Sequence, residues 1–174
     1  MRKDARENLE RIFAAAKQAF AEQGAAVTME EIARRAGVGI GTLYRRFASR
    51  AALVEALYAD DLDQIGAEAA ALAEHPDPWQ ALARWCEAYV TLVATKRTML
   101  AELTPLFDER PDWLEAQRRR ARATLGRFLE RAQQAGLARA DAEAADVIAL
   151  LNAAAGAGDA APRLLAIVLT GLKP

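Results

Sequence analysis

The sequence has 174 residues, enough for one domain or for a small domain joined to a larger one, and its many alanines and rare β-branched runs favour an all-α fold. Cys86 is the only cysteine, which excludes an internal disulfide and favours a reducing, cytoplasmic setting. The N-terminus is charged throughout and no apolar run approaches about 20 residues, so we expect neither a secretion signal nor a membrane partner. The formal net charge is −1, but residues 1–50 carry net +4 and residues 51–174 carry net −5, as expected of a polyanion-binding module attached to an acidic body.

The first two expected helices precede Gly37. Residues up to 23 place apolar side chains at helical spacing, and Gly24 suits the left-handed conformation that ends a helix. Thr28 and Glu31 form the pattern of a capping box, which opens a short second helix over 28–36. The two helices should bury Leu9, Ile12, Phe13, Ala16 and Phe20, and Met29, Ile32, Ala33 and Ala36.

The stretch GVGIGTLYRRF, residues 37–47, has two interpretations. Its alternating glycines resemble a phosphate-binding loop, but such a loop follows a buried strand, whereas the preceding EEIARRA predicts a capped helix. The alternative is a tight turn at 37–39 followed by a short helix from about 40 to 46, the geometry of a helix-turn-helix. We favour this second interpretation.

The helix over 40–46 should have two different faces. Leu43 and Phe47 lie four residues apart and are expected to pack on Ile32 and Phe13, with Val38 filling the space between the helices. The opposite face then carries a small apolar contact, a glycine, hydroxyls and cations, which suit a DNA groove and its phosphates. These residues are Ile40, Gly41, Thr42, Tyr44, Arg45 and Arg46.

At these residues the chain resembles the DNA-binding head of TetR-family transcriptional regulators. The resemblance covers residues 9–58 through the patterns T-x-x-x-I-A-x-x-A-G-V and G-T-L-Y-x-x-F. It implies double-stranded DNA as partner, phosphate contacts from Thr28, Tyr44, Arg45 and Arg50, and a base-facing side made by Ile40, Gly41 and Thr42. The family commonly has a serine or threonine where Gly39 stands, so this chain lacks the hydroxyl that would contact a phosphate at the start of the recognition helix. It also commonly has an acidic residue where Ala52 stands, which would complete the capping box begun at Ser49.

Less specific interpretations compete at several positions. Tyr44 could be a half-buried core residue, and Arg34 and Arg35 are better explained as a solvated helix face. The run 118–122 holds four arginines, which we interpret as a solvated or salt-bridged helix surface rather than a second DNA site. Arg2 and Lys3 either reach a neighbouring groove or are disordered.

A long helix should follow Ser49, its expected N-cap, with Leu53, Leu57, Leu62 and Ile65 inward. EHPDPW, residues 74–79, breaks this helix and starts another. Further helices are expected at 78–96, 98–108, 111–136, 141–157 and 160–172. No flexible linker separates the two parts, so we place a helix-turn-helix DNA-binding domain at residues 1–60, the head, continuous with a helical ligand-binding and dimerisation domain at residues 61–174, the body.

The segment from Trp79 to Trp113 gathers all three tryptophans with other large apolar residues and a few polar ones. Such a lining is typical of small-molecule pockets, although tryptophan and leucine at helical spacing are more often plain core. The resemblance implies a pocket between the body helices, and our guess is an apolar or aromatic effector. The residues we assign to it are Trp85, Tyr89, Met99, Leu103, Phe107, Trp113, Phe128 and Asn152.

The last two helices are rich in small residues, which allow close helix packing across a two-fold axis. We therefore expect a homodimer that places two recognition helices on a palindromic operator. The interface residues we assign are Ile148, Leu151, Ala155, Leu164, Ile167, Val168 and Gly171.

An enzyme is not expected, and neither is a cofactor or metal. His75 lies in a proline-flanked loop and Ser49 at a helix cap, so these residues are poorly placed for a nucleophilic arrangement with Cys86. A nucleotide-using enzyme and a helical protein-interaction module remain as rivals. The favoured function is a ligand-released dimeric repressor, since repression is the commoner behaviour in the family that the head resembles.

Overall fold

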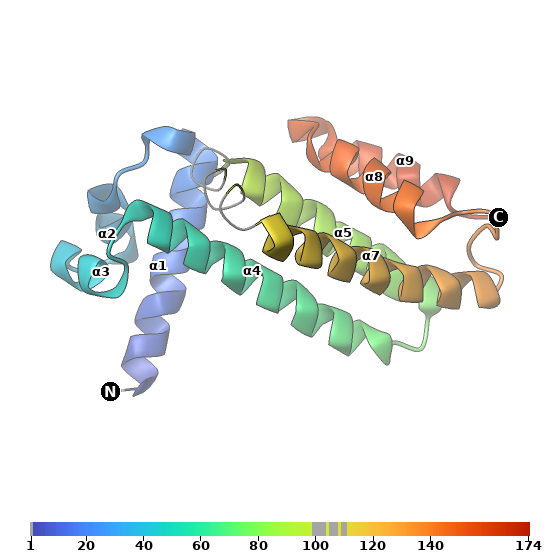
Figure 1. Ribbon diagram of the computed structural model, residues 1–174, viewed down its shortest axis with the longest axis horizontal. Helices are drawn as coiled ribbons and strands as arrows, with labels where there is room; N and C mark the ends of the chain where they lie inside the picture. The colour runs from blue at the N-terminus through green and yellow to red at the C-terminus, as the bar shows by residue number, and fades with distance from the viewer. Residues whose placement is uncertain (1, 99–103, 105–107, 109–110) are drawn as a thin grey trace. The chain divides into compact units, whose positions relative to one another are not determined.

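The computed structural model describes residues 2–98, 104, 108 and 111–174, and these residues form helices and short connections without any strand. The helices are α1 (Arg2–Gln23), α2 (Met29–Ala36), α3 (Ile40–Arg46), α4 (Arg50–Ala73), α5 (Pro78–Thr98), α7 (Pro111–Gln134), α8 (Ala144–Ala155) and α9 (Ala161–Gly171), with 3₁₀ turns η1 (Gly24–Ala26) and η2 (Gly158–Ala160) (Figure 1). None of the helices in these ranges is long and apolar enough to cross a bilayer. The prediction of an all-α fold is confirmed, whereas the helix expected at 98–108 falls mostly outside the described residues.

The chain divides into two compact units. The first comprises Met1–Asp60 with Thr95–Glu109, and the second comprises Asp61–Ala94 with Arg110–Pro174. The boundary lies inside two helices, because α4 and α5 each contribute residues to both units.

The first unit is built on the packing of α1 against α2. Most of the expected apolar stripe of α1 is buried, with Ile12 at 1% and Phe20 at 0% exposure, whereas Leu9 is half-buried; Ile32 of α2 is fully buried as well. Gly24, directly after α1, has a φ of +55°, and Gly37, at the end of α2, has a φ of +65°. Both glycines adopt the left-handed conformation that residues with a Cβ rarely take.

The cap at the start of α2 is half of the expected capping box. The Thr28 hydroxyl accepts a hydrogen bond from the Glu31 amide at 3.2 Å, as predicted. The Glu31 carboxylate, however, accepts bonds from Arg34 and Arg35 instead of reaching back to Thr28. Two charged donors one helical turn away outcompete a single backbone amide for this carboxylate.

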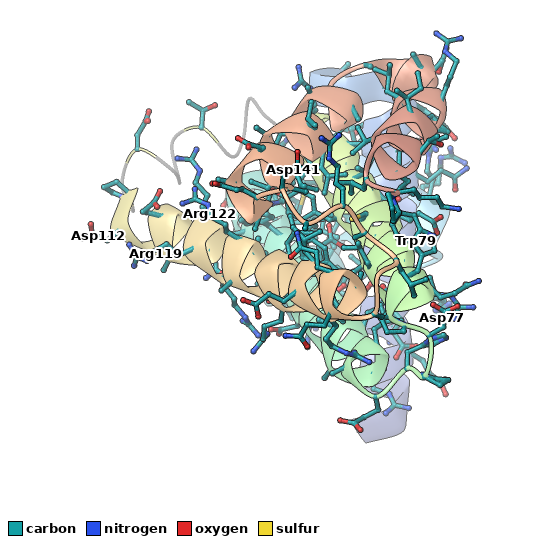
Figure 2. The ribbon with its side chains drawn as sticks, turned by 90° about the vertical axis from the view of Figure 1, so that its right-hand side faces the viewer. Asp77, Trp79, Asp112, Arg119, Arg122 and Asp141 are labelled. Carbon is teal, nitrogen blue, oxygen red and sulfur yellow. The ribbon has the colours of Figure 1, made fainter. Side chains whose placement is uncertain are left out.

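The connection between α4 and α5 matches the predicted break. Ser49 accepts from the Ala52 amide at 3.1 Å and so caps the start of α4. At the other end, the Arg131 guanidinium of α7 donates to the carbonyls of Ala73 at 2.7 Å and His75 at 3.0 Å. Asp77 then caps α5, because its Oδ1 accepts from the amides of Trp79 and Gln80 (positions 77 and 79 are labelled in Figure 2).

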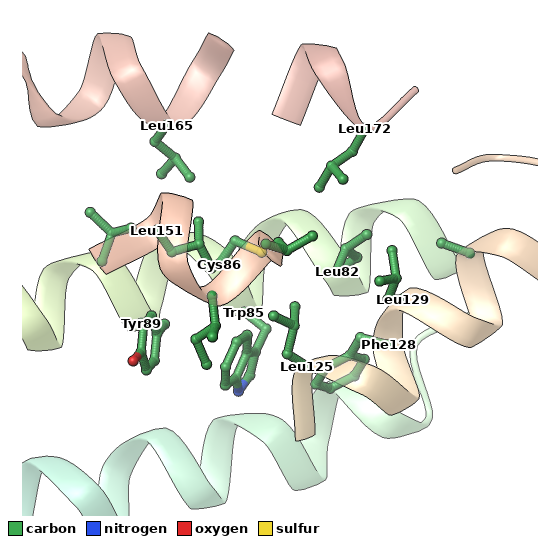
Figure 3. Close-up of a cluster of buried hydrophobic side chains, with 14 of the residues drawn as sticks. Leu82, Trp85, Cys86, Tyr89, Leu125, Phe128, Leu129, Leu151, Leu165 and Leu172 are labelled. Atoms are coloured by element: carbon green, nitrogen blue, oxygen red, sulfur yellow. The ribbon is translucent and has the colours of Figure 1, made fainter. Parts of the chain in front are cut away.

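The second unit has one hydrophobic core. It is formed by α5, α7, α8 and α9 together with Leu72 near the end of α4 (Figure 3). Trp85 is its largest fully buried side chain, and its ring stacks on Tyr89 with centroids 5.2 Å apart and lies 6.2 Å from the Phe128 centroid.

The boundaries of α7 and α8 differ from the predicted ranges. α7 ends at Gln134 rather than 136, and α8 begins at Ala144 rather than 141. The intervening loop is held by the Gln133 amide, which donates to the carbonyls of Arg139 and Ala142 at 3.0 Å, and by an ion pair between Arg139 and Asp141 at 2.6 Å. Since Asp141 is engaged in this loop, it does not start the helix.

Candidate nucleic-acid interface

The turn between α2 and α3 fixes the position of α3. Gly37 donates to carbonyls in the last turn of α2, and the Val38 amide donates to Ala33 O at 3.0 Å. Gly39 is the N-cap of α3 without a side-chain cap, and its carbonyl accepts from Thr42 N at 2.9 Å and Leu43 N at 3.1 Å. The helix starts from backbone bonds alone, as expected where a hydroxyl residue is replaced by glycine.

One face of α3 is anchored in the first unit. Leu43 is fully buried, and Phe47, which follows the helix, is 7% exposed. The Phe47 ring lies 6.1 Å from the Phe13 ring of α1. The burial of both side chains and the contact of Phe47 with Phe13 agree with the prediction.

The other face of α3 points to solvent. Ile40 is 39% and Tyr44 45% exposed, Arg45 and Arg46 are exposed as well, and a Cβ built on Gly41 would meet nothing within 4 Å. Tyr44 is therefore not the half-buried core residue that was the alternative. Thr42 is half-buried, and its hydroxyl accepts a bond from Arg45 Nη2 at 3.0 Å.

Arginines of α2 are already paired. Arg34 contacts Glu31 at 2.7 Å, and Arg35 bridges Glu31 at 2.7 Å and Glu22 of α1 at 2.6 Å. The hydrogen bonds from Arg34 and Arg35 lower the pKa of Glu31 to about 2. Arg35 joins α1 to α2, which the solvated-face interpretation missed, whereas Arg34 is 72% exposed as that interpretation predicts. The sequence hint was available in the spacing of Glu31 from Arg34 and Arg35.

Two further predicted phosphate contacts lie beside α3. Thr28 is exposed at the start of α2, where its oxygen accepts from Glu31 N and its own hydroxyl proton is left to donate. Arg50, at the start of α4, is half-buried, and its guanidinium carbon lies 4.9 Å from the centroid of Phe20.

The residues assigned to a ligand pocket divide into two groups. Trp85, Tyr89 and Phe128 are buried in the core of the second unit, and the Tyr89 hydroxyl donates to Asn152 Oδ1 at 3.1 Å. Met99, Leu103, Phe107 and the side chain of Trp113 lie outside the described residues. Cys86 lies in the same core, and burial raises the pKa of its thiol to about 12, so it is held as the unreactive neutral form.

The residues predicted for the dimer interface differ in burial. Ile148, Leu151 and Ala155 are 8%, 0% and 3% exposed in a single chain, so their side chains pack inside their own subunit. On α9, Ile167 is 61% exposed, Gly171 is exposed, and Leu164 and Val168 are half-buried. On α8 the exposed large side chain is Leu150, at 51%.

Two family models match the chain. Residues 12–57 match a model described as bacterial regulatory proteins, tetR family, and residues 77–174 match the C-terminal domain of SbtR-like transcriptional regulators. The first match ends just inside α4 and the second begins at the loop before α5.

Solved structures resemble the chain over nearly its whole length. A TetR transcriptional regulator from Streptomyces coelicolor is 32% identical, with 95% of this chain and 98% of that chain covered and a TM-score of 0.79. A TetR regulatory protein from Mycobacterium vanbaalenii is 35% identical, with 99% of each chain covered and a TM-score of 0.76.

A curated relative matches more locally. An HTH-type transcriptional regulator of Staphylococcus aureus (strain USA300) is 44% identical over 64 residues. This match spans 36% of the present chain and about a third, 35%, of the length of that relative.

Proposed function

The chain belongs to the TetR family of DNA-binding transcriptional regulators, and on that premise we propose that it is a dimeric repressor that leaves a palindromic operator when a small molecule occupies its body. The observation that carries this proposal is the two-sided α3, with Leu43 buried beneath an exposed row of hydroxyl, guanidinium and small side chains. Residues 1–60 are the DNA-binding head in this proposal, and residues 61–174 are the body.

In the bound complex α3 lies in the major groove. Ile40, Gly41 and Thr42 face base edges, and Gly41 leaves room for close approach. Tyr44, Arg45 and Arg46 follow toward the phosphates. One Arg45 donor is used by Thr42, which leaves the remaining N–H groups of its guanidinium for a phosphate.

Three predicted contacts lie around this helix. Thr28 offers its hydroxyl proton to a second phosphate from the start of α2. Gly39 contributes backbone only. Arg50 contacts a phosphate from the start of α4, beside the Phe20 ring.

Salt-dependent DNA binding tests the groove assignment. The double substitution Tyr44→Phe with Arg45→Gln should weaken binding to every DNA sequence and reduce the slope of log affinity against log salt by about 1. The matched control is Arg34→Gln, which removes the same charge from α2, where Arg34 is paired with Glu31. The measurement is a mobility shift on the fragment mapped upstream of the protein's own gene. If the double variant and the parent bound DNA with equal affinity at each salt concentration, the assignment of α3 to the DNA groove would be wrong.

The dimer we propose uses the exposed sides of α8 and α9, which pack side by side (Figure 1). Leu150 and Ile167 are the large apolar side chains of these two helices that are more than half exposed. Small neighbours on the same surfaces, such as Ala149 and Ala153, allow the helices of a second copy to approach closely. A two-fold axis then repeats the recognition helix at a spacing of about 34–36 Å, or a multiple of it, on DNA.

Oligomeric state tests this surface. Ile167→Glu should convert the dimer into a monomer in sedimentation velocity, because a carboxylate would be buried without a partner. Leu137→Glu is the control, since Leu137 is also exposed, at 40%, but lies outside α8 and α9. A dimer that survives Ile167→Glu and Leu150→Glu would place the interface elsewhere.

Release by an effector requires that a structural change in the body alters the DNA affinity of the head. α4 runs without interruption from its Ser49 cap to Ala73, so it carries residues of both units. In the second unit the end of the Arg120 side chain of α7 reaches α4, because a Cβ built on Gly66 would stand 3.1 Å from Arg120 Nη2. A ligand that shifts α7 would alter this contact with α4. A coupling of about 1–3 kcal/mol between ligand and DNA is ordinary for such a mechanism.

A further inference from the structure

Ile40, the first residue of α3, places an exposed apolar side chain on the face proposed to enter the DNA groove. It is 39% exposed, and Tyr44, one turn later on the same face, is 45% exposed. All residues of α3 are described, and these two are its exposed large hydrophobic side chains. Tyr44 has a hydroxyl that can bond to a phosphate, whereas the side chain of Ile40 consists of carbon alone. Ile40 therefore needs an apolar partner in the complex.

An isolated exposed isoleucine is ordinary on a protein surface, so the significance of Ile40 lies in its surroundings. Glycines stand on both sides of it. Among the described residues, a Cβ built on Gly41 would meet nothing within 4 Å, and a Cβ built on Gly39 would meet Thr42 Oγ1 at an unstrained 3.8 Å. Neither glycine has a positive φ. Packing and backbone conformation therefore leave room for side chains at both positions.

Gly41 has a cost without a return inside the chain. It lies within α3, where glycine weakens a helix relative to alanine. Since nothing in the described residues requires the missing side chain, the reason lies outside the chain. A surface that comes close to the backbone of α3 beside Ile40 supplies such a reason.

The major groove of DNA offers Ile40 one apolar group. Base edges there present hydrogen-bond donors and acceptors, and the exception is the C5 methyl group of thymine. In a helix-turn-helix, residues at the start of the second helix contact these edges, which is the place of Ile40 in α3. On cytosine the same side chain would remove water from the N4 amino group without offering an acceptor, which disfavours binding. The chemistry of Ile40 therefore fits a thymine.

We propose that Ile40 selects a thymine in each half-site of the operator by packing on its C5 methyl group, while Gly39 and Gly41 allow α3 to come close. This inference rests on the proposed docking of α3 in the groove and adds the base that the helix reads. Because the proposed dimer is symmetric, the two thymines are related by the two-fold axis of the operator.

Removal of single methyl groups from DNA tests the proposal. The probe is a duplex selected by the full-length parent from a pool of random sequences, with each thymine replaced in turn by deoxyuridine, which lacks only the C5 methyl group. In mobility shifts, deoxyuridine at one position of a half-site should weaken binding of the parent about fourfold, as expected for one buried methyl group. Ile40→Ala should bind the thymine and deoxyuridine duplexes equally at that position. Ile40→Val, which keeps the branched carbon, should retain part of the preference.

The matched control is Leu137→Ala, because Leu137 is 40% exposed, as Ile40 nearly is, but lies outside α3. It should discriminate between thymine and deoxyuridine like the parent, and circular dichroism verifies that each variant is folded. The proposal is overturned if no deoxyuridine weakens the parent, or if Ile40→Ala keeps the loss at the same position. Specific binding without a methyl effect refutes the role of Ile40 and leaves the groove docking intact. A parent that selects no DNA sequence refutes the docking itself, and the role of Ile40 with it.

Discussion

Leu43 and Tyr44 are neighbours in α3 with opposite burial, and this contrast yields a prediction about stability and DNA binding. Leu43→Ala removes three carbons from a side chain that is 0% exposed. At about 0.8 kcal/mol per buried CH₂ group, the lost transfer free energy is roughly 2.4 kcal/mol. A cavity contribution brings the expected loss in the free energy of unfolding to about 3–4 kcal/mol.

Tyr44→Ala should have a small effect on stability and a large effect on DNA affinity. Tyr44 is 45% exposed, so its loss should lower the free energy of unfolding by about 0.5–1 kcal/mol, while DNA affinity falls directly. The assay is urea unfolding followed by circular dichroism, paired with mobility shifts at concentrations of urea where both proteins remain folded. If Leu43→Ala unfolded at the parent's urea midpoint, or if Tyr44→Ala proved the more destabilising change, the two-sided description of α3 would be refuted.

Three further predictions follow from local contacts. The pKa of Glu31 is lowered to about 2 in the folded chain, so its ion pairs with Arg34 and Arg35 stabilise the fold above the ordinary carboxyl pKa of 4.5 and are lost as pH falls toward 2. The difference in unfolding free energy between the parent and Glu31→Gln, measured by urea unfolding at successive pH values, should therefore shrink between pH 4.5 and 2. A difference that stays constant over this range would contradict the prediction. Asp77→Ala removes the cap of α5 and should cost about 1 kcal/mol of unfolding free energy, whereas an unchanged midpoint would show that the cap is dispensable. Cys86 should react with iodoacetamide at pH 8 only after urea unfolding, since its buried thiol has a pKa of about 12, and rapid labelling of the folded chain, followed by mass spectrometry, would disprove its burial.

The head could be predicted closely because its faces differ in chemistry. In α3, Leu43 and Phe47 are apolar, while the other side offers hydroxyls, glycine and guanidinium groups, so only one face can enter the core. The caps Thr28 and Ser49 and the left-handed Gly37 marked the helix ends for the same reason: each residue type suits one position. Sequence patterns did not reveal that Arg35 bridges α1 and α2, since its partner Glu22 lies thirteen positions earlier.

The inner and outer faces of the body helices could not be predicted from the sequence, because these helices are apolar on more than one side. In α8, Leu151 faces the core and Leu150 faces solvent, and alanines surround both, so periodicity alone could not assign the inner side. The predicted interface consequently included three residues of the subunit's own core. Trp85 and Phe128 illustrate the related limit that core and pocket lining share one composition.

The hydrogen bonds from Arg131 to the α4–α5 connection have a practical consequence for protein engineering. A short, proline-flanked loop between two helices would ordinarily be chosen for inserting a tag or a reporter domain. Here one guanidinium spans the carbonyls of Ala73 and His75, and the Asp77 cap begins two residues later. An insertion at this place would detach α7 from the loop and uncap α5 at once.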